Sequence, residues 1–264
     1  MVTGTYLDSI GLFHRSRAAA DTRRFSVDGV APYDGPSFFE ALRNDQSHVS
    51  VIAEVKRASP SKGPLAADLD AAALASLYAA NGAAAISVLT DQAHFGAHAT
   101  DLPDVAKAVT IPRLRKDFTV FENDIFDALA MGASAVLLIA ALLDDRELER
   151  LSSLAHELQL SALFEIHDEE EASRVIDCGA TIIGINQRNL TTFAVDPEHA
   201  ARVVDRLPTS ALRVCESGLR DVADIERAAA AGFDAVLVGE TFVTSNNPAP
   251  LIRAFSSVVR QHIV

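Results

Sequence analysis

A glycine followed by a continuous apolar run recurs four times in this chain of 264 residues, and this repeat is the feature that most constrains the fold. The four glycines are 47 to 53 residues apart. Each one follows an alanine-rich helical pattern, where a left-handed residue would end a helix. Each run is continuous rather than alternating, which is typical of a strand buried on both faces in a parallel sheet. The segments are "NGAAAISVL" at Gly82, "MGASAVLLI" at Gly132, "CGATIIGIN" at Gly179 and "AGFDAVLVGE" at Gly232.

This spacing is about twice the length of one strand-plus-helix unit, so further strands are expected midway between the repeats. Suitable segments are present: "VSVIAEVK" from Val49, "IPRLRK" from Ile111, "SALFEI" from Ser161 and "LRVCES" from Leu212. Eight strands that alternate with helices predict an α/β fold, a closed (β/α)8 TIM barrel, with an open doubly wound sheet as the alternative. Within a single domain overall, we expect residues 1–47 to form an N-terminal helical extension and residues 48–264 to form the catalytic barrel. The extension should cover the bottom of the barrel or flank its mouth.

Composition excludes several classes of protein. The net charge of −13 argues against a general nucleic-acid or membrane-surface role, because phosphate backbones and anionic lipids require a basic face. No stretch approaches the length of a membrane span, and the first residues lack the apolar region of a signal peptide. Cys178 and Cys215 fit neither a zinc site nor a disulfide framework, which favours a reducing compartment. We expect a cytoplasmic protein that is a monomer or at most a weak oligomer.

Polar side chains stand at the ends of nearly all the predicted strands, where a barrel of this type carries its chemistry. In a strand of period two, Glu54 and Lys56 point the same way. Lys116 and Leu114 likewise point to one face of their strand, and Arg115 points to the other face. A single charged residue at a strand end is most often a solvated rim residue. Packing does not explain why polar residues recur at the ends of nearly all the strands. The strand-end residues are Glu54 and Lys56, Ser87, Lys116, Glu165, Asn186 with Arg188, Glu216 with Ser217, and Gly239 with Glu240.

Two further patterns indicate an anionic substrate and acid–base chemistry. Only four of the 23 basic residues are lysines, and two of them, Lys56 and Lys116, stand at strand ends. Unlike a guanidinium, an ammonium can give up its proton, and a neighbouring cation can lower its pKa into the range of a general acid. The segments "ESGL" and "VGETF" follow the seventh and eighth strands, where many barrels bind phosphate through backbone N–H groups. We therefore expect Gly218 and Gly239 to help bind a phosphorylated substrate.

Longer motifs give a more specific indication. In chain order they are "IAEVKRASPSKG", "AISVLTDQAHFG", "PRLRKDF", "FEIHDEEEASRVIDCGATIIGINQRNLTTFAVD", "ESGL" and "AVLVGETFV". From about Val49 to the C-terminus they resemble the indole-3-glycerol phosphate synthase family of tryptophan biosynthesis. The resemblance implies a carboxy-lyase without a cofactor. It would convert 1-(2-carboxyphenylamino)-1-deoxyribulose 5-phosphate, a small sugar phosphate, to indole-3-glycerol phosphate by ring closure, decarboxylation and dehydration. The loop "FGAHATDL" departs from the family pattern, in which a second glycine and an acidic residue are expected.

The resemblance also implies roles for individual residues. Lys116 would be the general acid that protonates the ketose carbonyl oxygen, and Glu165 would be the acid/base carboxylate of the dehydration. Lys56 would pair with anionic groups of the substrate and assist proton transfer, with Glu54 orienting it. Asn186 and Ser217 would be catalytic residues that hydrogen-bond the reacting groups. Arg188 would help hold the charged substrate or neighbouring carboxylates. The other residues that would bind the substrate are Ser59 in the first loop, Leu89, Phe118 and Leu138 against the anthranilate ring, and the backbone of Gly218, Gly239 and Glu240 around the phosphate.

The histidines are interpreted as non-catalytic. His94 and His98 have a spacing that could suggest a metal, but no third ligand accompanies them in the sequence. We therefore expect a solvated loop there and no metal site. His167 is expected to point away from Glu165.

Two alternative functions stay open. Another phosphate-binding barrel, such as a phosphoribosyl anthranilate isomerase, would usually place a cysteine and an aspartate at particular strand ends, and "VIAEVK" offers neither. A non-catalytic scaffold in a pathway complex is the other alternative. The presence of Glu54, Lys56, Lys116, Glu165 and Asn186 counts against a scaffold.

Overall fold

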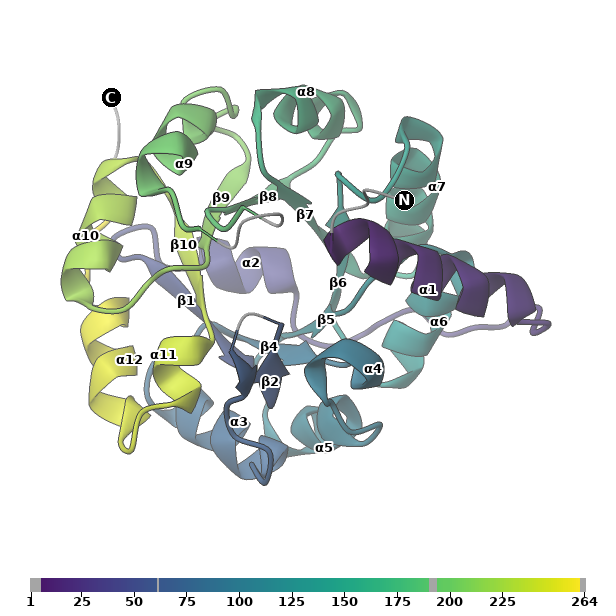
Figure 1. Cartoon of the computed structure of the whole chain (residues 1–264), viewed down its shortest axis with the longest axis horizontal. Helices are drawn as coiled ribbons and strands as arrows, with labels where there is room; N and C mark the ends of the chain where they lie inside the picture. Colours follow the sequence, from purple (N-terminus) through teal and green to yellow (C-terminus); the bar gives the residue numbers. More distant parts are fainter. Residues whose placement is uncertain (1–5, 61, 190–193, 262–264) are drawn as a thin grey trace.

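The structure is a computed structural model that describes residues 6–60, 62–189 and 194–261. Within these residues, eight parallel strands form a closed barrel in the order β1-β10-β9-β8-β7-β6-β5-β4 (Figure 1). Because β1 pairs with both β10 and β4, the open sheet is excluded and the (β/α)8 barrel is confirmed. All eight strands lie in the segments predicted for them. They are β1 (Ser50–Val55), β4 (Ala85–Leu89), β5 (Arg113–Lys116), β6 (Ala135–Ile139), β7 (Ser161–Ile166), β8 (Ile182–Asn186), β9 (Leu212–Glu216) and β10 (Ala235–Val238).

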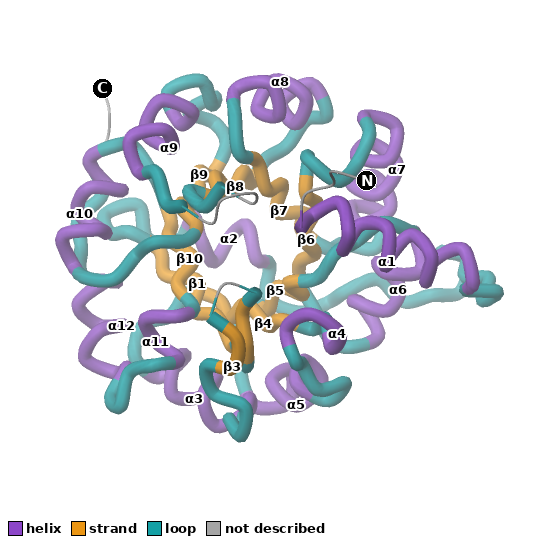
Figure 2. The backbone as a smooth tube through the Cα atoms, viewed as in Figure 1, coloured by secondary structure: helices purple, strands orange, loops and turns teal. Residues whose placement is uncertain are grey.

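Helices surround the ring of strands (Figure 2). Two short strands, β2 (Ala58–Ser59) and β3 (Gly63–Pro64), form an antiparallel pair in the loop after β1. The helices are α1 (Tyr6–Ala20), α2 (Phe38–Arg43), α3 (Ala71–Ala80), α4 (Gln92–Phe95), α5 (Asp101–Ala108), α6 (Glu122–Ala130), α7 (Asp145–Glu157), α8 (Glu169–Asp177), α9 (Pro197–Val204), α10 (Val222–Ala230), α11 (Glu240–Val243) and α12 (Pro248–Ser256).

Local chemistry sets where the helices begin and end. Six of the described helices, α3, α4, α7, α8, α9 and α10, begin after an aspartate whose side chain accepts a backbone N–H at the third helical position. At the other end, Gly132 follows α6 with a φ of 84°. Only glycine adopts this left-handed conformation without strain, so the chain turns there and enters β6. The predicted role of the repeated glycine is thus confirmed.

The strands separate two apolar layers. One face of each strand packs against the surrounding helices, and the other faces the barrel interior. At the bottom of the interior, Phe38 and Leu42 of α2 are fully buried against residues such as Ile52 and Leu114. Burying a side chain of this size contributes about 1.5–3 kcal/mol, so α2 acts as an apolar plug.

The first helix, α1, lies at the opposite end of the barrel, near its mouth. In Figure 1, α1 lies in front of the right-hand side of the barrel, near β6, whereas α2 is seen through the ring of strands. Arg15 donates a hydrogen bond to Glu147 at 2.6 Å, and Arg17 donates one to Asp124 at 2.5 Å. These ion pairs attach α1 to α7 and α6 near the mouth. The N-terminal segment therefore both closes the bottom and flanks the mouth.

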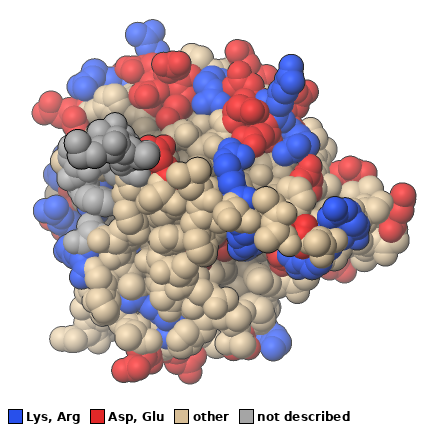
Figure 3. Space-filling view, turned by 45° about the vertical axis from the view of Figure 1, so that its right-hand side comes forward, with Lys and Arg blue, Asp and Glu red and all other residues tan. Residues whose placement is uncertain are grey.

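Charged side chains of both signs lie on the surface of the molecule. On the face in Figure 3, acidic and basic side chains are interspersed around a broad area of other residues. None of the helices that the structure describes is long and apolar enough to cross a membrane.

Candidate active site

A cavity of about 660 Å³ lies at the carboxyl ends of the barrel strands. It is lined by strand ends, by the loops that follow them and by α1. The structure brings together in this cavity every site residue predicted from the sequence except Leu138. These residues are Glu54, Lys56, Ser59, Leu89, Lys116, Phe118, Glu165, Asn186, Arg188, Ser217, Gly218, Gly239 and Glu240.

Carboxylates surround the ammonium group of Lys116. Its Nζ lies 3.1 Å from Glu165 Oε2 and 3.3 Å from Glu216 Oε2. On β1, Lys56 Nζ lies 2.7 Å from Glu54 Oε2, so these two side chains do share the inward face. Two ammonium groups are thus gathered with three carboxylates in a largely buried space. Such charges are tolerated only when they compensate one another, because their desolvation is costly.

The pKa of Lys116 follows from these neighbours. Burial lowers the pKa, but the charges of Glu165, Glu216 and Glu54 outweigh this effect and raise it above the ordinary value. This corrects the lowered pKa considered from the sequence, which requires nearby cations. Lys116 therefore keeps its proton at neutral pH.

Glu165 and Glu216 differ in protonation. Burial raises the pKa of Glu165, but the charges of Lys116 and His167 and a hydrogen bond from Asn186 lower it to about 2. For Glu216, burial and the charge of Glu165 raise the pKa to about 8 against the opposing effect of Lys116. The pKa values of these two neighbouring carboxyl groups are thus shifted in opposite directions. Paired groups with separated pKa values of this kind can divide the roles of base and acid.

A short chain of hydrogen bonds orients Glu165. Asn186 Nδ2 donates to Glu165 Oε1 at 3.0 Å, and Ser217 Oγ donates to Asn186 Oδ1 at 2.8 Å. The backbone N–H of Arg188 donates to the same Oδ1 at 3.0 Å. Ser217 has a φ of 69°, a left-handed conformation that is uncommon for serine. Strain of this kind is typical of residues held for function.

Two glycines make room for the charged groups. A Cβ atom at Gly184 on β8 would collide with the Glu216 carboxylate, and one at Gly239 would collide with Glu54 and approach Lys56 Nζ. Small residues at these inward positions therefore let the carboxylates converge. Gly239 also precedes α11, where the carboxylate of Glu240 pairs with Lys62.

A profile of the indole-3-glycerol phosphate synthase family matches residues 14–255. The chain belongs to this family. A protein of Mycolicibacterium gilvum named indole-3-glycerol phosphate synthase is 50% identical over 256 residues, which cover 94% of this chain and 92% of that protein. One of the same name from Micrococcus luteus is 48% identical over 225 residues, covering 85% and 84%.

Two solved structures are similar in fold alone. N-acetylmannosamine-6-phosphate 2-epimerase from Clostridium perfringens has a TM-score of 0.61 at 14% identity, covering 81% of this chain and 93% of that one. Thiamine phosphate pyrophosphorylase from Pyrococcus furiosus has a TM-score of 0.59 at 15% identity, covering 78% and 93%. The strand-end site of this synthase-family member is therefore best interpreted from its own residues.

Sequence reasoning missed several residues of the cavity. Glu216 was placed at a strand end but given no role, although its alternation with Val214 already predicts an inward side chain. Tyr6, Leu7 and Ile10 of α1 also line the cavity. Their helix precedes the barrel, and nothing in the local sequence indicates which strand ends it approaches.

Two predictions of side-chain direction were wrong. Leu138 is fully buried among the helix-facing residues of β6, whereas its neighbours Leu137 and Ile139 line the cavity. His167 is two residues beyond Glu165 and so approaches the same side of the chain, with Nε2 at 3.8 Å from Glu165 Oε1. Burial lowers the pKa of His167, but a hydrogen bond to Glu171 and the charge of Glu165 raise it overall.

The histidines of the loop after β4 are separated by the fold. His98 is exposed, as predicted. His94 is not a solvated residue, because its side chain is only 20% exposed and Nδ1 lies 2.6 Å from Asp91 Oδ2.

Proposed function

We propose that this chain catalyses the indole-3-glycerol phosphate synthase reaction. Its substrate would be 1-(2-carboxyphenylamino)-1-deoxyribulose 5-phosphate, which undergoes ring closure, decarboxylation and dehydration. One observation carries the proposal. The ammonium group of Lys116 lies within 3.3 Å of two carboxyl groups, those of Glu165 and Glu216, in the cavity at the mouth of the barrel.

Ring closure needs an electrophile. Lys116 would donate its proton to the ketose carbonyl oxygen while the ring carbon that bears the carboxylate attacks the carbonyl carbon. The raised pKa keeps the ammonium charged, so that it stabilises the oxygen as negative charge develops. Loss of carbon dioxide then restores the aromaticity of the benzene ring.

Dehydration needs a proton for the departing hydroxyl group and a base for the proton lost beside it. Glu165, ionised and oriented by Asn186, would be the acid/base group of this step. The raised pKa of Glu216 makes it a further candidate donor to the departing hydroxyl group. Elimination would then complete the five-membered ring of indole-3-glycerol phosphate.

The remaining residues of the cavity would hold the two ends of the substrate. Charge from Lys56 and Arg188 would bind anionic groups, with Glu54 orienting Lys56. Ser59 and Ser217 would offer hydroxyl groups. The anthranilate ring would lie against Leu89 and Phe118, with Leu137 in place of Leu138, and the phosphate would lie against the backbone of Gly218, Gly239 and Glu240.

We also propose how the chain is organised. Residues 1–47 would be an extension of a single domain whose barrel spans residues 48–264. This division is supported by the start of β1 at Ser50 and by α1, which completes the cavity wall. The free thiols of Cys178 and Cys215 favour a reducing cytoplasm, and we propose a monomer there.

Addition of the carboxyphenylamino ketose phosphate tests the proposal directly. Indole fluorescence should appear above a low background, because the chain has no tryptophan. Folded protein at high concentration that leaves the substrate unchanged would contradict the proposed activity.

The variant Glu165→Gln then tests the role of the carboxylate. It keeps the shape of the side chain but cannot accept a proton, so rapid-quench mass spectrometry should show substrate loss ahead of indole formation. Turnover should fall by about 10²–10⁴-fold. The matched control is Glu170→Gln on exposed α8, which should behave as the unmodified chain. If substrate loss and product formation stay synchronous in Glu165→Gln, the glutamate only balances charge.

A further inference from the structure

A cluster of three potential metal ligands lies behind the wall of the mouth cavity. His14 comes from α1, and Asp91 and His94 come from the start of α4. His14 Nε2 lies 3.2 Å from Asp91 Oδ2, and His94 Nδ1 lies 2.6 Å from the same oxygen. The three ligand atoms are all within 4.8 Å of one another. His14 and Asp91 are each only 4% exposed, so the cluster is built into the protein rather than gathered on its surface.

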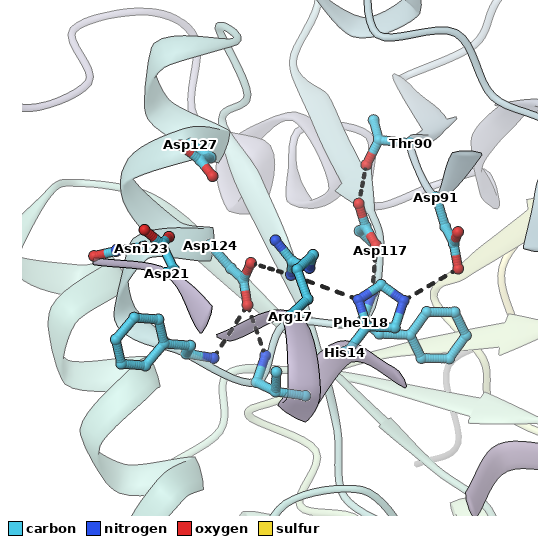
Figure 4. A network of polar contacts seen from close by, with 12 residues as sticks. His14, Arg17, Asp21, Thr90, Asp91, Asp117, Phe118, Asn123, Asp124 and Asp127 are labelled. Carbon is cyan, nitrogen blue, oxygen red and sulfur yellow. Dashed lines mark hydrogen bonds and ion pairs between the residues drawn. The ribbon is translucent and has the colours of Figure 1, made fainter. Parts of the chain in front are cut away.

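The hydrogen bonds around Asp91 leave one oxygen for this cluster. Its Oδ1 accepts the backbone N–H of His94 at 3.0 Å and so caps α4. Its Oδ2 points to the two imidazole rings, as Figure 4 shows for His14. His94 thus gains two potential co-ligands that are different from the His98 considered from the sequence: Asp91, three residues before it, and His14, which lies 77 residues before Asp91.

The surrounding charges permit a cation. The nearby arginines are engaged by other carboxylates: Arg17 by Asp124 at 2.5 Å and Arg115 by Asp117 at 2.9 Å. Arg17 Nη2 also lies 3.5 Å from His14 Nδ1, the ring nitrogen that does not face Asp91 (Figure 4). Coordination through Nε2 would place the ring proton on Nδ1, so this long contact would open while Arg17 keeps Asp124.

We propose that His14, Asp91 and His94 bind one divalent transition-metal ion. Imidazole nitrogen favours ions such as Zn²⁺, Ni²⁺ and Cu²⁺ over Mg²⁺ and Ca²⁺. Bonds of about 2.0–2.2 Å in a tetrahedron place the ligand atoms about 3.3–3.5 Å apart. The distance of 3.2 Å between His14 Nε2 and Asp91 Oδ2 already fits this spacing. The distance of 2.6 Å between Asp91 Oδ2 and His94 Nδ1 must lengthen by a fraction of an ångström. Three protein ligands leave the fourth position to water.

Such an ion would fasten α1 to the loop after β4. This matters for the cavity, because the His14 ring packs against Phe118 with centroids 5.1 Å apart, and Phe118 lines the cavity. The same helix contributes Ile10 to that lining. Metal binding would therefore hold one wall of the mouth in place.

The experiment uses untagged full-length protein, freed of metal with a chelator and titrated with Zn²⁺ by calorimetry. One ion per chain should bind, and His94→Gln should weaken binding by at least tenfold. His14→Gln should do the same. His98→Gln is the matched control, since His98 is an exposed histidine of the same loop. Its affinity should equal that of the unmodified chain.

Two further readouts make the test independent of enzyme activity. Co²⁺ in place of Zn²⁺ should give the visible absorption of a tetrahedral site, and Zn²⁺ should raise the unfolding temperature of the unmodified chain but not of His94→Gln. His94→Gln retains the Asp91 cap of α4 and should fold. Absence of binding, or equal affinity in the unmodified chain and both histidine variants, would overturn the proposal. Loss of binding in His98→Gln would place the ion elsewhere and would also overturn it.

Discussion

The bottom and the top of the barrel interior are built on the same strands from opposite kinds of residue. At the bottom, inward side chains are apolar and pack against α2. Two residues further along four of the strands, a distance of about 7 Å along the strand, the inward side chain is ionisable. The pairs are Ile52 and Glu54, Leu114 and Lys116, Leu163 and Glu165, and Val214 and Glu216.

Stability and chemistry therefore depend on different layers of the barrel interior. Apolar burial at the bottom holds the barrel together. The charged layer above contributes little to stability, because desolvation of buried charges offsets much of their attraction. Substitutions at the bottom should therefore change the free energy of unfolding, and substitutions at the top should change turnover.

Removal of the acid from the top layer should have the largest effect. Lys116→Ala should lower kcat by about a hundredfold or more while substrate still binds, because the proton for ring closure is lost. Lys116→Arg should not restore the rate, since a guanidinium keeps its proton. Steady-state kinetics would measure both variants, with exposed Lys107→Ala as the control. Full activity in the arginine variant would show that only positive charge is needed.

At the bottom, Leu42→Ala should lower the free energy of unfolding by about 2–5 kcal/mol, since it leaves a cavity under the barrel. Chemical denaturation would measure the change. The values of kcat and KM should stay unchanged in the folded variant, because Leu42 does not line the mouth cavity. A fall in kcat at constant stability would contradict the separation of the two layers.

A third test is the pH dependence of the free energy of unfolding that Glu216 causes. Its pKa rises from 4.5 to about 8 on folding, so the folded chain keeps a proton that the unfolded chain loses between these values. The resulting stabilisation is complete below about pH 4.5 and is lost as the pH rises through about 8. Denaturation at pH 5, 6.5 and 8 should therefore show a decline that is weaker in Glu216→Gln. Glu165, with its pKa lowered to about 2, adds an opposite slope that is confined mainly to pH values below about 5, and the raised pKa of His167 adds a further decline across this range. If the free energy of unfolding declines equally with pH in the unmodified chain and in Glu216→Gln, the proton is bound by a group other than Glu216.

Local patterns were sufficient to predict much of the molecule. Continuous apolar runs and repeated glycines predicted the eight strands, and period-two alternation predicted that Glu54 and Lys56 face one cavity. The direction of Leu138 was predicted without that alternation, and at His167, two residues after Glu165, the alternation was applied with the wrong parity. Both directions follow from it when it is counted correctly.

Other features depend on contacts between distant parts of the chain and could not be predicted in this way. The pKa of Lys116 rises because carboxylates from three other strands converge on it. His94 is only partly exposed because α1 packs against its loop, with the rings of His14 and His94 5.9 Å apart. The sequence contains these residues but does not show which of them meet.

The attachment of α1 has a consequence for the order in which the protein is synthesised. A ribosome makes α1 first among the described helices, but the partners of Arg17 and Arg15 follow 107 and 132 residues later. Until α6 and α7 emerge, this helix has no surface to dock on, and contacts over such separations are slow to form. The part of the cavity wall that is translated earliest therefore cannot be completed until α7 and the four barrel strands before it, β1, β4, β5 and β6, have been made.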